Sequence, residues 1–212
     1  MPEYLELLIY SSIISIYVLF AEIIFFILIR GFIKDSILRI FAYVWVPLAA
    51  LTQFLMTYFR VHLGKPNLPI MNIYLIIEMI LLIFILLKIR ERYKKKKTNY
   101  FIWLPVVLIG IVLHFTDNLN SIHSAAMLYT AIVFFNLTIS FIDLEKASEL
   151  YRDPYALINL GVFVKAVGYS YFTIYKIDYK FPLSIYSAVN LLVQAIFFVA
   201  IYFYYRSEKK KA

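Results

Sequence analysis

Long apolar segments of about 20 residues, separated by short polar stretches, constrain the fold of this chain more than any other feature. A helix of that length crosses the ~30 Å hydrocarbon core of a bilayer. Hydrophobic residues make up 63% of the 212 residues and charged residues only 16%, whereas roughly a quarter of an average soluble domain is charged. The sequence therefore predicts an all-α, polytopic membrane protein.

Seven such segments are predicted to form one transmembrane domain, a seven-helix bundle over residues 1–212. They cover residues 5–29, 37–59, 68–87, 100–115, 122–142, 154–175 and 182–205. Pro47 lies inside the second segment and predicts a kink there, because proline removes a helical hydrogen bond. The first residues are acidic where a signal peptide would be basic, so the first segment is interpreted as a span.

Basic residues are distributed unevenly between the two sets of connections. Of the 21 Lys and Arg residues, 16 lie in or beside the odd-numbered connections and the C-terminal tail, and four lie in the even-numbered connections. Cytoplasmic loops of membrane proteins are enriched in Lys and Arg. This bias predicts a multi-pass protein of the plasma (inner) membrane, with its N-terminus outside and its C-terminus in the cytoplasm.

The same bias accounts for the net charge of +8 without a nucleic-acid partner. The lysine clusters at residues 94–97 and 209–211 predict contact with anionic lipids at the cytoplasmic face, beyond the general contact with membrane lipids. The sequence leaves open whether a cytoplasmic signalling partner docks there. It also leaves open whether the chain forms a homo-oligomer.

Two ionisable residues lie near the middle of their segments, Glu78 in the third and Lys165 in the sixth. A charge at the bilayer midplane costs about 2.5–3.5 kcal/mol, so the two are predicted to form a pair. Gly161 and Gly168 share the helical face of Lys165 and allow close approach of another helix, which predicts that Lys165 points into the bundle. Tyr169, one turn further along, is predicted to hydrogen-bond to either partner.

This pair has two interpretations. It either locks the third and sixth helices together, or it forms a charged centre for a ligand, a proton or a conformational switch. Further polar residues inside the segments, Glu22, Asn190 and Gln194, are candidates for the same centre. The alternative for these three is ordinary interhelical hydrogen bonding, worth about 0.6 kcal/mol per contact.

A second group of polar residues lies toward the predicted outer side. It comprises Gln53, Asn72, His114, Asp117 and His123. Together these residues are predicted to form the mouth of an outward-facing pocket. The alternative is a solvated turn, because Asp and Asn are common turn and helix-capping residues.

The sequence contains few residues in patterns typical of a metal or cofactor site. The chain has no cysteine, and its three histidines are widely spaced, so no metal site is predicted. Retinal is disfavoured because residues 182–205 contain no lysine to attach it. No cofactor is expected.

Two stretches resemble a family of uncharacterised small bacterial seven-helix membrane proteins. They are Asn72-Ile-Tyr-Leu-Ile-Ile-Glu78 and Asp153-Pro-Tyr-Ala-Leu-Ile-Asn-Leu-Gly161, and the similarity extends loosely over the second to seventh segments. Glu78 and Asn159 match the pattern of the family, whereas Lys165 stands where an apolar or aromatic residue is expected. The resemblance implies a receptor-like protein linked to histidine-kinase signalling.

Three functions remain in competition. The favoured one is a receptor-like or signalling protein that binds a small ligand or lipid within the bundle. A proton- or ion-coupled transporter or channel subunit is the first alternative, although the chain has no internal repeat and only five glycines. An integral lipid-modifying enzyme is the least favoured, because the spacing of His114, Asp117 and His123 matches no metalloenzyme signature.

Overall fold

The computed structural model describes residues 3–64, 68–94, 97–115, 124–139, 152–174 and 180–211, and these residues form helices and connections without a β-strand. The helices are α1 (Glu3–Leu28), α2 (Ser36–Ile40), the π-helical turn η1 (Phe41–Trp45), α3 (Val46–Val61), α4 (Leu68–Lys94), the 3₁₀ turn η2 (Tyr100–Trp103), α5 (Leu104–Phe115), α6 (Ser124–Ile139), α8 (Pro154–Ile174) and α9 (Lys180–Lys209). The all-α prediction is confirmed. Each predicted segment overlaps one of these helices or a continuous run of them, but α4 extends seven residues beyond the predicted end at Leu87 and α9 four residues beyond Tyr205. Residues 122–123, 140–142 and 175 of the predicted segments lie outside the described residues.

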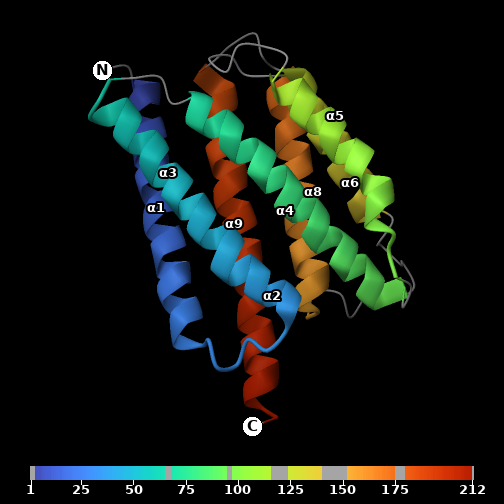
Figure 1. The fold of residues 1–212 in the computed structure, drawn as a ribbon. Helices are drawn as coiled ribbons and strands as arrows, with labels where there is room; N and C mark the ends of the chain where they lie inside the picture. Colours follow the sequence, from blue (N-terminus) through green and yellow to red (C-terminus); the bar gives the residue numbers. More distant parts are fainter. Residues whose placement is uncertain are drawn as a thin grey trace.

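The helices lie side by side along one bundle (Figure 1). α9 packs between α8 and α1, α6 covers α8, and α3 covers α1. α4 crosses the bundle obliquely and contacts α2, η1, α3, α5, α6 and α8. α1 begins and α9 ends at opposite ends of the bundle (Figure 1).

Three helical stretches in the described part of the chain are long and apolar enough to cross a membrane. They are Ser36–Phe59, Pro69–Lys94 and Ala188–Lys209, with mean hydropathies of 1.6, 2.7 and 1.8. Shorter apolar helices cover Ile13–Leu28, Tyr100–Phe115 and Ala125–Ile139. Length and composition thus support a membrane protein with at least these three spans.

The second predicted segment is one continuous helical run, α2–η1–α3, that changes its winding at η1. The π-helical turn ends at Trp45, two residues before Pro47, which lies at the start of α3. Pro47 has no N–H to donate to a carbonyl one turn back, so the regular α-helical ladder is interrupted here. The sequence predicted this irregularity as a kink.

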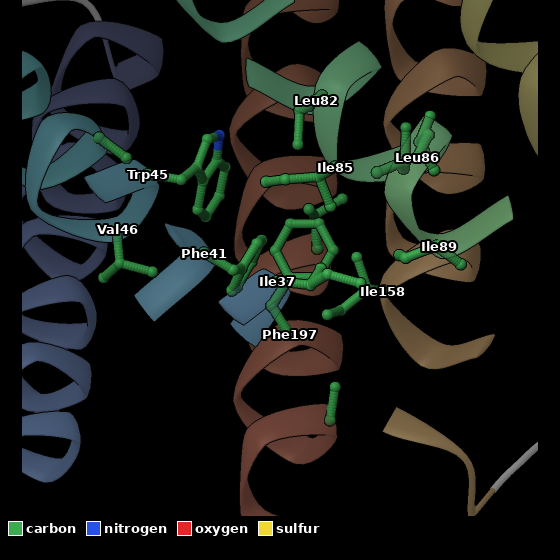
Figure 2. Close-up of a cluster of buried hydrophobic side chains, with 14 of the residues drawn as sticks. Ile37, Phe41, Trp45, Val46, Leu82, Ile85, Leu86, Ile89, Ile158 and Phe197 are labelled. Carbon is green, nitrogen blue, oxygen red and sulfur yellow. The ribbon is translucent and has the colours of Figure 1, made fainter. Parts of the chain in front are cut away.

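Aromatic packing at η1 fixes the centre of the core. Phe41 stacks on Trp45 with ring centroids 4.9 Å apart, and the ring of Phe197 from α9 meets both edge-on, at 4.6 and 5.1 Å. Figure 2 shows these rings beside Leu82 and Ile85 of α4. All five side chains are at most 2% exposed, so η1, α4 and α9 are held in a fixed relation.

Candidate functional site

The carboxyl group of Glu78 lies just beyond this aromatic core and is 1% exposed. It forms an ion pair with Lys165. Its Oε1 also accepts hydrogen bonds from Trp45 Nε1 at 3.2 Å and from the Tyr74 hydroxyl at 2.5 Å. Its Oε2 accepts one from the Tyr169 hydroxyl at 2.5 Å. Four donors therefore offset the cost of burying this carboxylate.

Three elements supply these donors. Trp45 comes from η1, Tyr74 lies one turn before Glu78 on α4, and Lys165 and Tyr169 lie one turn apart on α8. The predicted contact between Glu78 and Lys165 is confirmed, as is the hydrogen bond from Tyr169.

The Lys165 ammonium group also lies over two aromatic rings. It is 5.3 Å from the ring centroid of Trp45 and 5.7 Å from that of Tyr169. Aromatic faces attract cations at such distances. Lys165 is 4% exposed, so the prediction that it points into the bundle is confirmed. The neighbouring glycines, Gly161 and Gly168, face α9 at Phe197 and Val189.

A cavity of about 60 Å³ reaches this centre from one side. Lys165, Trp45 and Tyr74 line it together with Met56 of α3 and Met71 of α4. α3 ends and α4 begins at the end of the bundle where α1 begins (Figure 1). A space of this size holds several water molecules. Among the described residues that line it, Lys165 is the only one with a charged side chain.

Amides and hydroxyls make up the polar part of the cavity wall. Gln194 of α9 donates a hydrogen bond to the Ser15 hydroxyl of α1 at 3.0 Å. Gln53, Asn190 and Thr52 also line the cavity. The structure thus brings Lys165 together with Asn190, Gln194 and Gln53, four residues that the sequence assigned to two separate groups.

Glu22 lies on the same face of α1 as Ser15 and Leu19 but does not line the cavity. It is 2% exposed, and neither carboxyl oxygen has a hydrogen-bond partner in the described part of the chain. Glu22 therefore lies two turns beyond Ser15 along α1 and does not belong to the cavity beside Lys165.

The predicted outer pocket is not formed by the described residues as a group. Gln53 lines the cavity, whereas Asn72 and His114 are each 1% exposed, on α4 and α5, and neither lines it. Asp117 and His123 lie outside the described residues. Of the described residues in this prediction, only Gln53 lines the cavity.

Sequence reasoning missed two donors, Trp45 and Tyr74. Tyr74 precedes Glu78 by four residues, and residues at this spacing are neighbours on a helix, so the pattern could have identified it. Trp45 belongs to another helical element, η1, and aromatic residues make up 19% of the chain, so a single aromatic residue is not conspicuous in the sequence. Nothing in the local sequence distinguishes it.

No family model, no curated protein and no solved structure matches this chain. Within the described residues, no group of three or more His, Cys, Asp or Glu side chains is placed to hold a metal ion. The function is therefore inferred from the geometry of the charged centre and its cavity.

Proposed function

We propose that this chain is a seven-span membrane protein, with its N-terminus outside and its C-terminus in the cytoplasm, that binds a small polar ligand in the cavity beside Lys165. The observation that carries the proposal is the position of Lys165, whose ammonium group is fixed by Glu78 and yet lines the cavity. The charge distribution of the loops supports the orientation, which places the cavity on the outer side of the charged centre.

The lining of the cavity indicates the chemistry of the ligand. An ammonium group has three N–H donors, so Lys165 has donors beyond the one directed at Glu78. Gln53, Asn190 and Gln194 add amides that both donate and accept. A ligand with a carbonyl or carboxylate oxygen matches this wall. Its size is limited to a few non-hydrogen atoms, because drug-sized ligands occupy clefts of about 300–1,000 Å³.

Trp45 provides a spectroscopic test, because its indole lines the cavity and contacts Glu78. The Trp103→Phe variant leaves Trp45 as the single tryptophan. This protein, in phosphatidylcholine nanodiscs, would be titrated with acetate, propionate and acetamide. We expect a saturable change in Trp45 emission. We expect the same titration to give no saturable change in the Glu78→Gln/Lys165→Met double variant.

The double variant is chosen because it removes the ion pair without leaving one buried charge alone. Lys88→Met, which removes a lysine outside the cavity, is the matched control and should titrate like the parent. A response that does not saturate with any of the three probes, or that persists in the double variant, would show that the cavity is not the binding site.

In this proposal, ligand binding is communicated to the cytoplasmic end through α4 and α8, which the ion pair joins. A cytoplasmic signalling partner would receive the response, in line with the resemblance to the bacterial seven-helix family.

A proton-coupled transporter is the second candidate, and Glu22 is the observation that favours it. A buried carboxyl group without a hydrogen-bond partner is a common feature of proton relays within membranes. Proton flux into proteoliposomes that is lost in Glu22→Gln and kept in Glu91→Gln would favour this function over ligand reception. Equal flux in liposomes without protein would exclude it.

A further inference from the structure

A groove of about 730 Å³ is lined by segments at the end of the bundle where α9 ends, opposite to the end where α1 begins (Figure 1). It is lined by the connection between α1 and α2, the last turn of α4, the residues around the start of α8, and the end of α9. α4 and α9 belong to the stretches that are apolar enough to cross a membrane. The groove therefore lies at the depth where these helices leave the hydrocarbon core.

Four cationic side chains from four separate segments line the groove. Lys34 precedes α2, Arg92 is in the last turn of α4, Arg152 precedes α8, and Lys211 follows α9. Segments far apart in the sequence thus converge on one positive site. Lys34, Arg92 and Arg152 lie outside the lysine runs at 94–97 and 209–211, and only Lys211 belongs to one of those runs.

The three acidic residues of the groove interact with neighbouring groups of the chain itself. Asp35 accepts hydrogen bonds from backbone N–H groups at the start of α2 and pairs with Arg92 at 2.8 Å. Asp153 accepts one from the Tyr155 N–H at the start of α8, at 2.8 Å. Glu208 pairs with Lys211 at 2.6 Å. With four cationic and three acidic side chains, the lining of the groove has a net charge of +1.

Aromatic side chains form the rest of the groove. The Arg92 guanidinium lies 4.2 Å from the ring centroid of Tyr155, which holds it across the gap between α4 and α8. Tyr93, Phe203 and Tyr204 complete this part of the wall. Tyrosines are typical of the interfacial belt where a bilayer meets water, and basic pockets between helix ends at that level recognise phosphate headgroups.

We infer that this groove binds the phosphate headgroup of an anionic phospholipid. The cations supply the charge, Tyr93 and Tyr204 supply hydroxyl groups at headgroup depth, and the volume lies within the range of ligand-binding clefts, about 300–1,000 Å³. The site is independent of the ligand proposed for the cavity beside Lys165, and it does not require that either end of the bundle face the cytoplasm.

Thermal unfolding in detergent with added lipid tests the inference. The parent should be stabilised by phosphatidylglycerol more than by phosphatidylcholine. In Lys34→Gln/Arg152→Gln the apparent affinity for phosphatidylglycerol should fall up to roughly 30-fold. The matched control is Lys97→Gln/Lys210→Gln, which removes two charges at the same end without touching the groove lining, and it should keep the parent response.

Each other outcome overturns the assignment. An equal loss in both double variants would show that only the general positive charge of this end attracts lipid. No preference for phosphatidylglycerol over phosphatidylcholine in the parent would exclude an anionic lipid site. Equal stabilisation by millimolar inorganic phosphate would assign the groove to a soluble anion. Arg92 is left unchanged in all variants, because it also pairs with Asp35 and lies over the Tyr155 ring, so its loss would change more than the charge of the groove.

Discussion

Glu78 joins three elements of the bundle through a single carboxyl group. Trp45 of η1, Tyr74 of α4, and Lys165 and Tyr169 of α8 all direct a donor toward it. Because the carboxylate and the ammonium group are both almost fully buried, each depends on the other. The removal of one leaves an uncompensated charge in a medium of low dielectric.

The coupling between these two charges leads to the first prediction. Lys165→Met and Glu78→Gln should each destabilise the protein, Lys165→Met by about 3–5 kcal/mol because it leaves a bare carboxylate. The double variant should be clearly milder than the sum of the two. The free energy of unfolding, measured in mixed micelles of increasing dodecyl sulfate content, would check this. If the double variant equals the sum, the two side chains do not stabilise each other.

Trp45 allows a subtler test at the same scale. Trp45→Phe keeps an aromatic ring beside Phe41 and Phe197 but removes the N–H that Glu78 accepts. A hydrogen bond to a charged group contributes about 1.5–3 kcal/mol, so a loss in this range is expected by the same unfolding measurement. Trp103→Phe, a half-buried tryptophan on η2, is the control. Equal losses in both variants would contradict the role given to the indole N–H.

At the scale of elements, α8 and α9 are packed closely at two glycines. A Cβ atom built on Gly161 would overlap the ring of Phe197, and one on Gly168 would lie 2.7 Å from a methyl group of Val189. Phe197 is 1% exposed and is held by Phe41 and Trp45, so its ring has little room to move. This contact also keeps Lys165 facing inward.

Gly161→Ala should therefore destabilise the protein by about 1–3 kcal/mol through overpacking, although alanine is the better helix former. The control is Gly31→Ala, because nothing lies within 4 Å of a Cβ atom at that position. Its effect should stay within about 0.5 kcal/mol. Thermal unfolding in detergent compares the two, and a neutral Gly161→Ala would mean that α9 can shift away from α8.

Asp35 has two separable roles at the start of α2. Its carboxyl group caps the helix by accepting from the N–H groups of Ile37 and Leu38, at 2.9 and 3.1 Å, and it also pairs with Arg92. Asparagine caps as well as aspartate does, but it carries no charge. Each role can therefore be removed without the other.

Asp35→Asn should cost no more than about 1 kcal/mol, since Arg92 is 53% exposed and such pairs are weak. Asp35→Ala should cost about 1 kcal/mol more, because the cap is lost as well. Chemical unfolding curves of the two variants give the difference directly. Equal stability of the Asn and Ala variants would mean that the cap contributes nothing.

At the scale of the whole molecule, the orientation in the membrane decides which end of the bundle faces the outside of the cell. The chain contains no cysteine, so single cysteines can be introduced without background. In intact cells, a membrane-impermeant maleimide should label His62→Cys, in the exposed connection between α3 and α4, and should not label Lys97→Cys or Lys210→Cys. All three should react in permeabilised cells. Labelling of Lys210→Cys in intact cells would reverse the proposed orientation.

Much of the fold could be predicted from the sequence because its causes are local. Apolar length sets where each helix lies, and most predicted segments begin or end within a few residues of a helix in the structure. The exception is α4, which continues past Leu87 through charged residues to Lys94. The pair of Glu78 and Lys165 was predictable for a similar reason. Each charge is costly near the midplane on its own, and each was the simplest partner available to the other.

The rest depended on contacts between helices, which residue spacing does not specify. Trp45 joined the charged centre because the turn at η1 brings its indole beside Glu78. Glu22 stayed apart from Lys165 although both are buried and ionisable. Gln53 came to share one cavity with Gln194, while His114 was buried elsewhere.

The sequence by itself determined that the chain is a set of apolar helices with most of its basic residues in alternate connections and the C-terminal tail, because hydrophobic length and loop charge are properties of each segment. Only the tertiary structure decided which side of each helix faces which neighbour. The cavity beside Lys165 and the groove around Arg92 both arise from that choice. Each is lined by side chains far apart in the sequence, which only the packing of the helices brings together.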